Sequence, residues 1–229
     1  MLADDEETPD LHFTAPIPPI LLLDFAAECR RTADSGRTKL RGSMGWRSDN
    51  SWGFPPKFAP VVFDTIANEL GAITFSWMAL EAFANFALSA VASKEFSYER
   101  LMKGGGTKSY SARKAEADIP VMEKVTAVLP QIFTAVGSLP EDLGAELDAL
   151  RDLRRRTEHL KAADHYNTEN LKAGPMGLAL VGRVCAPQIV CRIVRHFGEA
   201  WMVPELAAKV SALDTAGLRA PEQGPKKAR

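Results

Sequence analysis

The sequence is poor in cysteine and has no excess of charge of either sign. Its three cysteines, Cys29, Cys185 and Cys191, are an odd number in 229 residues, and they form no Cys-x-x-Cys pair or Cys/His cluster. These features argue against a disulfide framework and a zinc site, and they favour a reducing compartment. The formal net charge is −1 and the sequence pI is about 6.4. We therefore expect any contact with nucleic acid to come from a local patch and not from a global basic field.

The chain also has few long hydrophobic runs that are free of prolines and charged residues. Residues 17–23 are too few to cross a bilayer and include two prolines, and the more apolar stretch 176–203 is interrupted by charged residues. Residues 1–10 are acidic, whereas a signal peptide starts with basic residues. We expect a soluble, cytoplasmic protein with no membrane segment.

Hydrophobic spacing predicts helices along most of the chain, with no convincing strand pair and no internal repeat. We expect a single helical domain over residues 16–203, preceded by a disordered acidic segment over 1–15. A short helix and a loose tail are expected over 204–229. The fold class predicted is all-α, a bundle of four or five helices. The helices are expected at about residues 21–32, 59–93, 121–136, 141–163 and 176–201, with bends at Pro130 and Pro187.

Two connecting segments are rich in glycine and polar residues and are predicted to be loops. Residues 33–57 carry Trp46 and Trp52 among basic residues. These tryptophans could stack single-stranded bases or could anchor the loop by packing. Residues 94–118 contain three successive glycines between lysines. They lack the full phosphate-loop spacing and follow a predicted helix and not a strand, so a linker is favoured over a nucleotide site.

The helix expected over 59–93 is apolar nearly all round in its second half, which is typical of a central helix. It carries Glu81 and Asn85 four residues apart, and therefore on the same face. Burying them without partners would cost about 2–7 kcal/mol each, so we expect them to form hydrogen bonds. Arg154 is the predicted partner of Glu81. Direct catalysis and simple exposure are the alternatives for this pair.

The helix expected over 141–163 carries the most informative pattern in the chain. Arg154 lies five residues before His159 near the end of this helix. A guanidinium is always charged and can hold a phosphate, while an imidazole titrates near neutrality. The histidine could take the proton of an RNA 2′-hydroxyl or protonate the leaving 5′-oxygen, and this chemistry needs no metal and no cofactor. The leucines of the helix recur at helical spacing: Leu143, Leu147, Leu150, Leu153 and Leu160.

Arg154 and His159 do not share a face of an ideal helix. Five residues turn the helix by about 500°, which separates the two side chains by about 140° around the axis and by about 7.5 Å along it. A kink near Thr157 could bring them together. A two-fold dimer would do so through two copies of the motif in one cleft, and we favour this homodimer. The alternative is an ordinary charged helix end, where basic residues suit the dipole.

These segments resemble the HEPN superfamily of small all-α domains, over roughly residues 59–203. The family carries an Arg-x4–6-His motif near the end of a late helix, often with a polar residue, commonly Asn, right after the arginine. Arg154, Arg155 and His159 take these positions, and the lead-in at 150–153 is also similar. Residues 79–85, with the sequence ALEAFAN, resemble the apolar helix of many bacterial members.

The resemblance implies a homodimeric, metal-independent endoribonuclease that works in toxin–antitoxin, phage-defence or CRISPR-linked systems. Its catalytic residues would be Arg154 and His159. The supporting residues would be Arg155, Glu81 and Asn85, and the RNA-binding rim would be formed by Arg151, Arg156 and Lys161.

The resemblance also bears on partners. Lys161 stands where members paired with nucleotidyltransferase antitoxins have a tyrosine, which argues against that pairing. Another antitoxin or a defence-system protein is the expected partner besides RNA. Some family members have lost activity. The alternative function is therefore a non-catalytic helical module that binds nucleic acid or a protein partner.

Overall fold

The computed structural model describes residues 18–43, 45–46, 52–92, 95–158, 182, 184–198 and 204–215. The protein is mostly helical, so the prediction of an all-α class is confirmed at this coarse level. The expectations for residues 1–15 and for the tail beyond residue 215 lie outside the described part.

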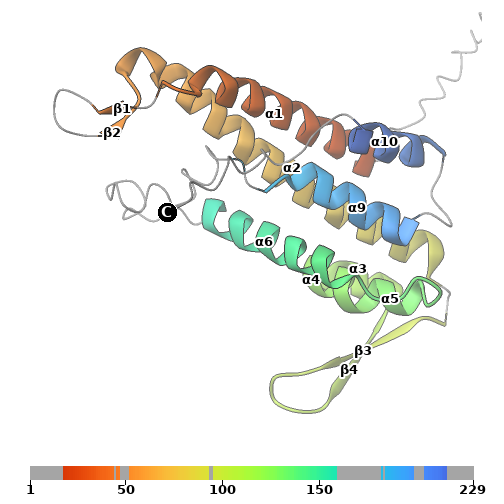
Figure 1. Cartoon of the computed structure of the whole chain (residues 1–229). Coiled ribbons are helices and arrows are strands. Elements are labelled where there is room, and N and C mark those ends of the chain that lie inside the picture. The colour runs from red at the N-terminus through yellow and green to blue at the C-terminus, as the bar shows by residue number, and fades with distance from the viewer. Residues whose placement is uncertain are drawn as a thin grey trace, which may run out of the picture.

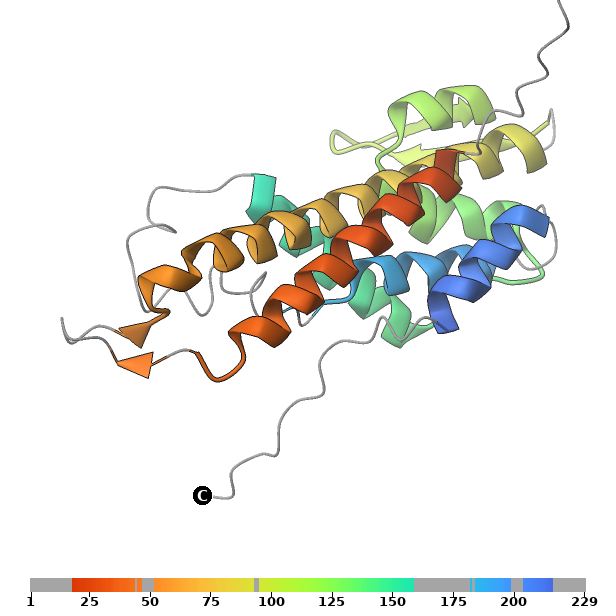
Figure 2. The same cartoon turned by 90° about the horizontal axis from the view of Figure 1, so that it is seen from above.

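Two long antiparallel helices, α1 (Pro18–Leu40) and α2 (Ala59–Val91), pack along each other in the bundle (Figures 1 and 2). They approach closely at small residues. A Cβ atom on Gly36 would overlap the Thr65 hydroxyl, and one on Gly71 would lie 3.0 Å from the sulfur of Cys29. Glycine is therefore required at Gly36 for the two helices to pack at this distance.

Three further helices complete the bundle: α6 (Glu141–Glu158), α9 (Ala186–Gly198) and α10 (Pro204–Thr215). The four leucines of the α6 stripe within the described part, Leu143, Leu147, Leu150 and Leu153, are all buried. They belong to one core cluster with residues of α1, α2, α9 and α10. The helical period that predicted this helix therefore also identified its core face.

The helix predicted at 121–136 is a composite. It consists of α4 (Val121–Glu123), a π-helical segment η2 (Lys124–Val128) and α5 (Leu129–Ile132). The irregular turn directly precedes Pro130, which cannot donate a backbone hydrogen bond within a helix. The sequence predicted a bend at Pro130, and the structure has the π-helical segment η2 just before this proline.

The prediction of a loop over 33–57 was wrong in its first part, because α1 continues to Leu40. Asp34 and Arg37 form an ion pair within this part of the helix, and Arg37 also pairs with Glu69 of α2. These pairs stabilise the helix against the weak propensity of Asp34. The loop that follows contains a minimal strand pair, β1 (Gly45–Trp46) with β2 (Trp52–Gly53), and a short 3-10 helix, η1 (Pro56–Phe58). Trp46 is the backbone partner of Trp52 in this pair.

The prediction of a linker over 94–118 was also wrong, as was the prediction that no strands pair. Residues 97–111 form an antiparallel hairpin, β3 (Ser97–Leu101) with β4 (Thr107–Ser111), and α3 (Ala112–Asp118) follows it. The hairpin projects from the helices below α6 (Figure 1). The glycines that suggested a linker form its turn, where Gly105 and Gly106 have positive φ angles of 83° and 77°.

The last predicted helix begins later than expected. Gly182 lies in a turn, and α9 starts at Ala186 with Pro187 inside its first turn. A proline there costs no hydrogen bond, so no kink is needed. The short helix expected after residue 203 is α10, which starts at Pro204 and contributes Leu206, Val210 and Leu213 to the main core cluster.

By length and composition alone, Pro56–Ala90 could cross a membrane. Half of its most apolar window is buried inside the fold. Central helices of soluble proteins can have the same length and composition, so this segment is weak evidence for a membrane span.

Candidate functional site

Arg154 lies at the junction of α6 and α2, in the last turns of α6. Its guanidinium carbon is 4.9 Å from the centre of the Trp77 ring, and its Nη2 is 2.6 Å from Oε1 of Glu158. The Trp77 side chain is buried in the core, whereas the Arg154 side chain remains 34% exposed. The cation–π contact and the ion pair therefore hold this guanidinium in place while part of it faces solvent.

The predicted pairing of Arg154 with Glu81 was wrong. Glu81 is exposed, and Arg154 pairs with Glu158, one turn further along its own helix. A helix always brings residues i and i+4 together, so the local carboxylate meets the arginine without any tertiary adjustment.

The other half of the predicted motif lies outside the described residues. His159 follows directly after Glu158, the last residue of α6, and Lys161 and His165 also lie beyond the described part. The distance between Arg154 and His159 therefore stays a prediction.

The remaining arginines of α6 form a charged outer face. Arg151 is exposed and pairs with Asp148 at 2.8 Å and with Asp152 at 3.2 Å. Arg155 and Arg156 are exposed as well. Such exposed pairs contribute about 0.2–1 kcal/mol, so the arginines can be drawn to a phosphate at little cost to the fold.

Asn85 does form the hydrogen bond that its burial predicted, but its partner is Lys124. The Lys124 side chain is almost fully buried, and its Nζ donates to Oδ1 of Asn85 at 2.6 Å and to the backbone oxygen of Glu116 at 2.5 Å. Burial lowers the pKa of Lys124, and the charges of Glu81 and Glu116 oppose this effect. Glu81 and Asn85 thus support a buried ammonium group at the π-helical turn, a role that the sequence did not suggest.

The lowered pKa of Lys124 predicts a pH dependence of stability. The folded protein releases this proton at a lower pH than the unfolded chain does, so between the two pKa values the unfolded chain binds more protons. The free energy of unfolding should therefore rise with pH in that window. Lys124→Met removes this titration, so the difference in stability, wild type minus variant, should grow as pH increases from about 7 to about 10.

Urea denaturation at a series of pH values measures this difference. Lys114→Met, on the exposed side of α3, controls for the loss of a lysine. A difference for Lys124→Met that stays flat over this range, or falls, would contradict the prediction.

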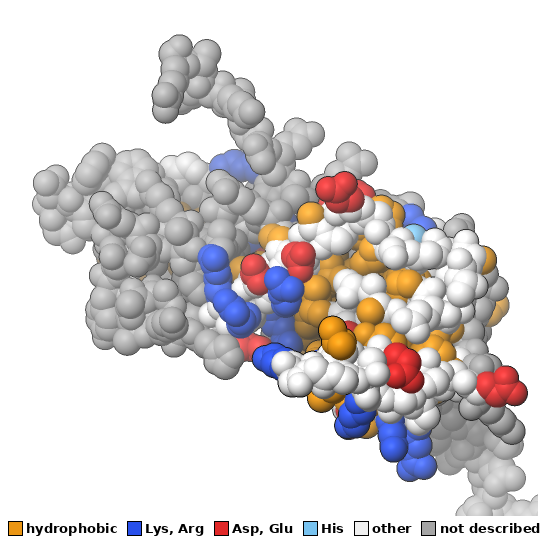
Figure 3. Space-filling model, turned by 90° about the horizontal axis from the view of Figure 1, so that it is seen from below, with side chains coloured by type: hydrophobic (Ala, Val, Ile, Leu, Met, Phe, Trp, Pro, Cys, Tyr) orange, Lys and Arg blue, Asp and Glu red, His pale blue; other side chains and the backbone are white. Residues whose placement is uncertain are grey.

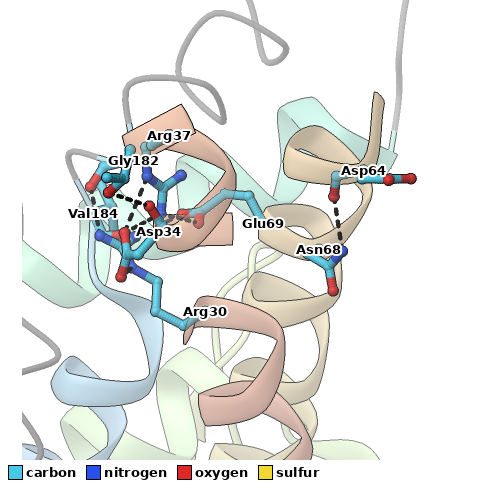
Figure 4. Close-up of polar contacts among 9 residues, drawn as sticks. Arg30, Asp34, Arg37, Asp64, Asn68, Glu69, Gly182 and Val184 are labelled. Atoms are coloured by element: carbon cyan, nitrogen blue, oxygen red, sulfur yellow. Dashed lines mark hydrogen bonds and ion pairs between the residues drawn. The ribbon is translucent and has the colours of Figure 1, made fainter. Parts of the chain in front are cut away.

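A second buried polar cluster joins α1 to α2, and sequence analysis missed it (Figure 4). The Arg30 side chain is fully buried and Glu69 is 1% exposed. Arg30 donates to Oε1 of Glu69 at 2.9 Å, to Asp34 at 3.0 Å, and to the backbone oxygens of Gly182 at 2.9 Å and Val184 at 3.1 Å. Four acceptors thus surround one guanidinium and link α1, α2 and the chain that leads into α9.

Arg37, predicted on a loop, belongs to the same cluster. It donates to Asp34 at 2.6 Å and to Oε2 of Glu69 at 3.0 Å. Burial raises the pKa of Glu69, while the charges of Arg30 and Arg37 oppose the rise. The available signal for Glu69 was its place as one of three carboxylates on a mostly apolar helix. Because each carboxylate oxygen of Glu69 already accepts a hydrogen bond, we assign the cluster a structural role.

Within the described ranges, no three His, Cys, Asp or Glu side chains gather in a way that could hold a metal ion. The described part of the site offers the partly exposed guanidinium of Arg154, and His159 follows five residues later in the sequence. Comparison with protein-family models, with curated proteins and with solved structures finds no match for this chain.

Proposed function

We propose that this protein is a metal-independent endoribonuclease of the HEPN type that acts as a cytoplasmic homodimer. The observation that supports it best is the setting of Arg154. A partly exposed guanidinium rests on a buried tryptophan, at the end of an amphipathic helix and five residues before His159. An arginine whose orientation is fixed while its donors stay accessible suits phosphate binding.

The proposed reaction uses the nucleophile that RNA itself carries. The 2′-oxygen attacks phosphorus, a new bond forms between them, and the bond from phosphorus to the 5′-oxygen breaks. One imidazole takes the proton of the 2′-hydroxyl, and an imidazolium protonates the leaving 5′-oxygen. Arg154 stabilises the negative charge that accumulates on the phosphate oxygens. The products are a 2′,3′-cyclic phosphate and a 5′-hydroxyl.

A homodimer supplies the second histidine. A two-fold axis near the end of α6 would place two copies of the motif in one cleft, so that one His159 acts as base and the other as acid. The exposed Arg155, Arg151 and Arg156 would then line the approach to the cleft. An antitoxin or defence-system protein that covers this cleft would regulate the enzyme.

Cleavage of total cellular RNA in excess EDTA tests the proposal. Wild type should release discrete fragments with cyclic-phosphate ends, and His159→Ala should slow cleavage by about 10²–10⁴-fold because general acid–base catalysis contributes that much. His165→Ala is the matched control, a histidine outside the motif, and should cleave like wild type. Unchanged cleavage by His159→Ala, with the fold intact by circular dichroism, would refute the catalytic assignment.

A second candidate function is a non-catalytic helical module that binds a protein partner. It is favoured by large apolar side chains exposed on the two longest helices, namely Leu21, Phe25, Phe63 and Met78. In this case wild type, Arg154→Ala and His159→Ala would all leave RNA intact. Substituting Phe25 with serine would then reduce binding of the partner.

A further inference from the structure

The β3–β4 hairpin is a rigid projection from the bundle. Tyr98 and Tyr110 face each other across the two strands, and both are buried in a small second core with residues that include Leu88 and Ile119. The Tyr98 hydroxyl donates to Glu123 at 2.9 Å. The base of the hairpin is therefore fixed to the helices by packing and by a hydrogen bond.

The tip of the hairpin is an ordered turn. The Met102 amide donates to the Gly106 oxygen, and the Gly105 amide donates to the Met102 oxygen, each at 3.0 Å. Leu101 is 78% exposed at this tip, and Met102 is exposed beside it. Two neighbouring apolar side chains are therefore available at the tip for contact with a partner.

The hairpin and the start of α3 are strongly basic, although the whole chain is not. Residues 97–114 contain five cations and a single carboxylate, against a net charge of −1 for the protein. Arg100 is neutralised by Glu123 at 2.7 Å, and Lys108 lies over the Tyr110 ring. The other three cations, Lys103, Arg113 and Lys114, are exposed and have no ion pair within the described residues.

We propose that this hairpin holds the phosphodiester backbone of a single RNA strand. The inference rests on the proposed function and adds to it a substrate contact outside the Arg154 motif. Lys103 at the tip of the hairpin, with Arg113 and Lys114 at the start of α3 next to its base, can attract phosphates. The exposed leucine and methionine side chains at the tip can pack against or between bases.

The position of the hairpin favours RNA over other polyanions. The hairpin and α6 lie on the same side of the molecule in Figure 1, and Figure 3 looks onto this side. Lys and Arg side chains lie along the left and lower edges of the exposed hydrophobic surface there, with some Asp and Glu side chains on the same face. A strand that reaches the arginines of α6 can therefore continue toward the hairpin, whereas a flat lipid surface would engage the tip alone.

Binding of a fluorescent single-stranded RNA with 2′-O-methyl groups, which cannot be cleaved by the proposed route, tests the inference. The variant is K103Q/R113Q/K114Q. Its control is R31Q/K57Q/K209Q, which removes the same charge from solvent-accessible positions on α1, η1 and α10. We expect the hairpin variant to bind about 100-fold more weakly at about 0.1 M salt, because three lost contacts change log affinity by about 2 between about 1 M and about 0.1 M salt. The slope of log affinity against log salt should fall by about 2, because each lost phosphate contact contributes about 0.7 for a single strand.

The outcomes separate this inference from the proposed function. Weaker binding and a smaller slope for the hairpin variant alone support the hairpin contact, whether or not wild type cleaves RNA. Equal losses in both variants would show a net-charge effect and overturn it. Cleavage by wild type with full RNA binding by the hairpin variant would overturn the hairpin contact and leave the nuclease intact. Absence of RNA binding by wild type, with binding of anionic phosphatidylserine vesicles that depends on the hairpin, would also overturn it.

Discussion

Arg30→Ala is expected to lower the free energy of unfolding by about 3–5 kcal/mol, because it leaves buried partners without their cation. Glu69 would keep only Arg37 as a donor, and the backbone oxygens of Gly182 and Val184 would lose their hydrogen bonds. The loss reflects unpaired buried groups more than the strength of the pair itself. Urea denaturation measures this loss of stability. The slope of the unfolding free energy against urea concentration should be the same for both proteins.

Arg31→Ala is the matched control, one residue further along α1. Arg31 is half exposed and pairs with Glu28 at 2.6 Å within the helix, so its loss should cost about 0.3–0.5 kcal/mol. Replacing both Arg30 and Glu69 with methionine should recover part of the loss, since it removes buried charges together. A stability of Arg30→Ala within about 1 kcal/mol of wild type would refute the structural role of the cluster, because surface substitutions cost that little.

The buried cluster illustrates what the sequence could not predict. The spacing of hydrophobic residues predicted α2 and the core face of α6, because this spacing repeats over many residues. Arg30, in contrast, bonds to Glu69 and Gly182, which are 39 and 152 residues away along the chain. No local pattern specifies such partners, since they depend on how three segments pack.

In the candidate site too, the sequence predicted the local feature and missed the contacts that depend on tertiary packing. The sequence identified Arg154 from its spacing to His159 on a helix with a leucine stripe, and the structure buries the four described leucines of that stripe. Its contact with Trp77 required knowing how α6 lies against α2, which helical period does not give. The hairpin was missed because three glycines suit a flexible linker as well as a tight turn, and the contacts of Tyr98, Tyr110 and Arg100 that anchor it are made with residues outside the hairpin.

Trp77→Ala is expected to cost about 3–5 kcal/mol of stability, since it opens a cavity between α2 and α6. Trp77 is buried in the same core cluster as Leu150 and Leu153. Trp77→Phe should cost less, because most of the packing remains while the ring offers a weaker surface to a cation. Thermal or urea unfolding measures both changes, and Ile73→Val, one turn earlier on α2, controls for a small loss in the same core.

A double-mutant cycle of Trp77→Phe with Arg154→Ala isolates the contact itself. We expect a coupling free energy of about 0.5–1 kcal/mol, the range for partly exposed cation–π pairs. If Trp77 positions Arg154 for phosphate binding, Trp77→Phe should also slow RNA cleavage, while Ile73→Val of similar stability should not. A coupling near zero would mean that Glu158 alone orients the guanidinium. In that case Glu158→Gln, which removes the charge of that partner, should slow cleavage instead.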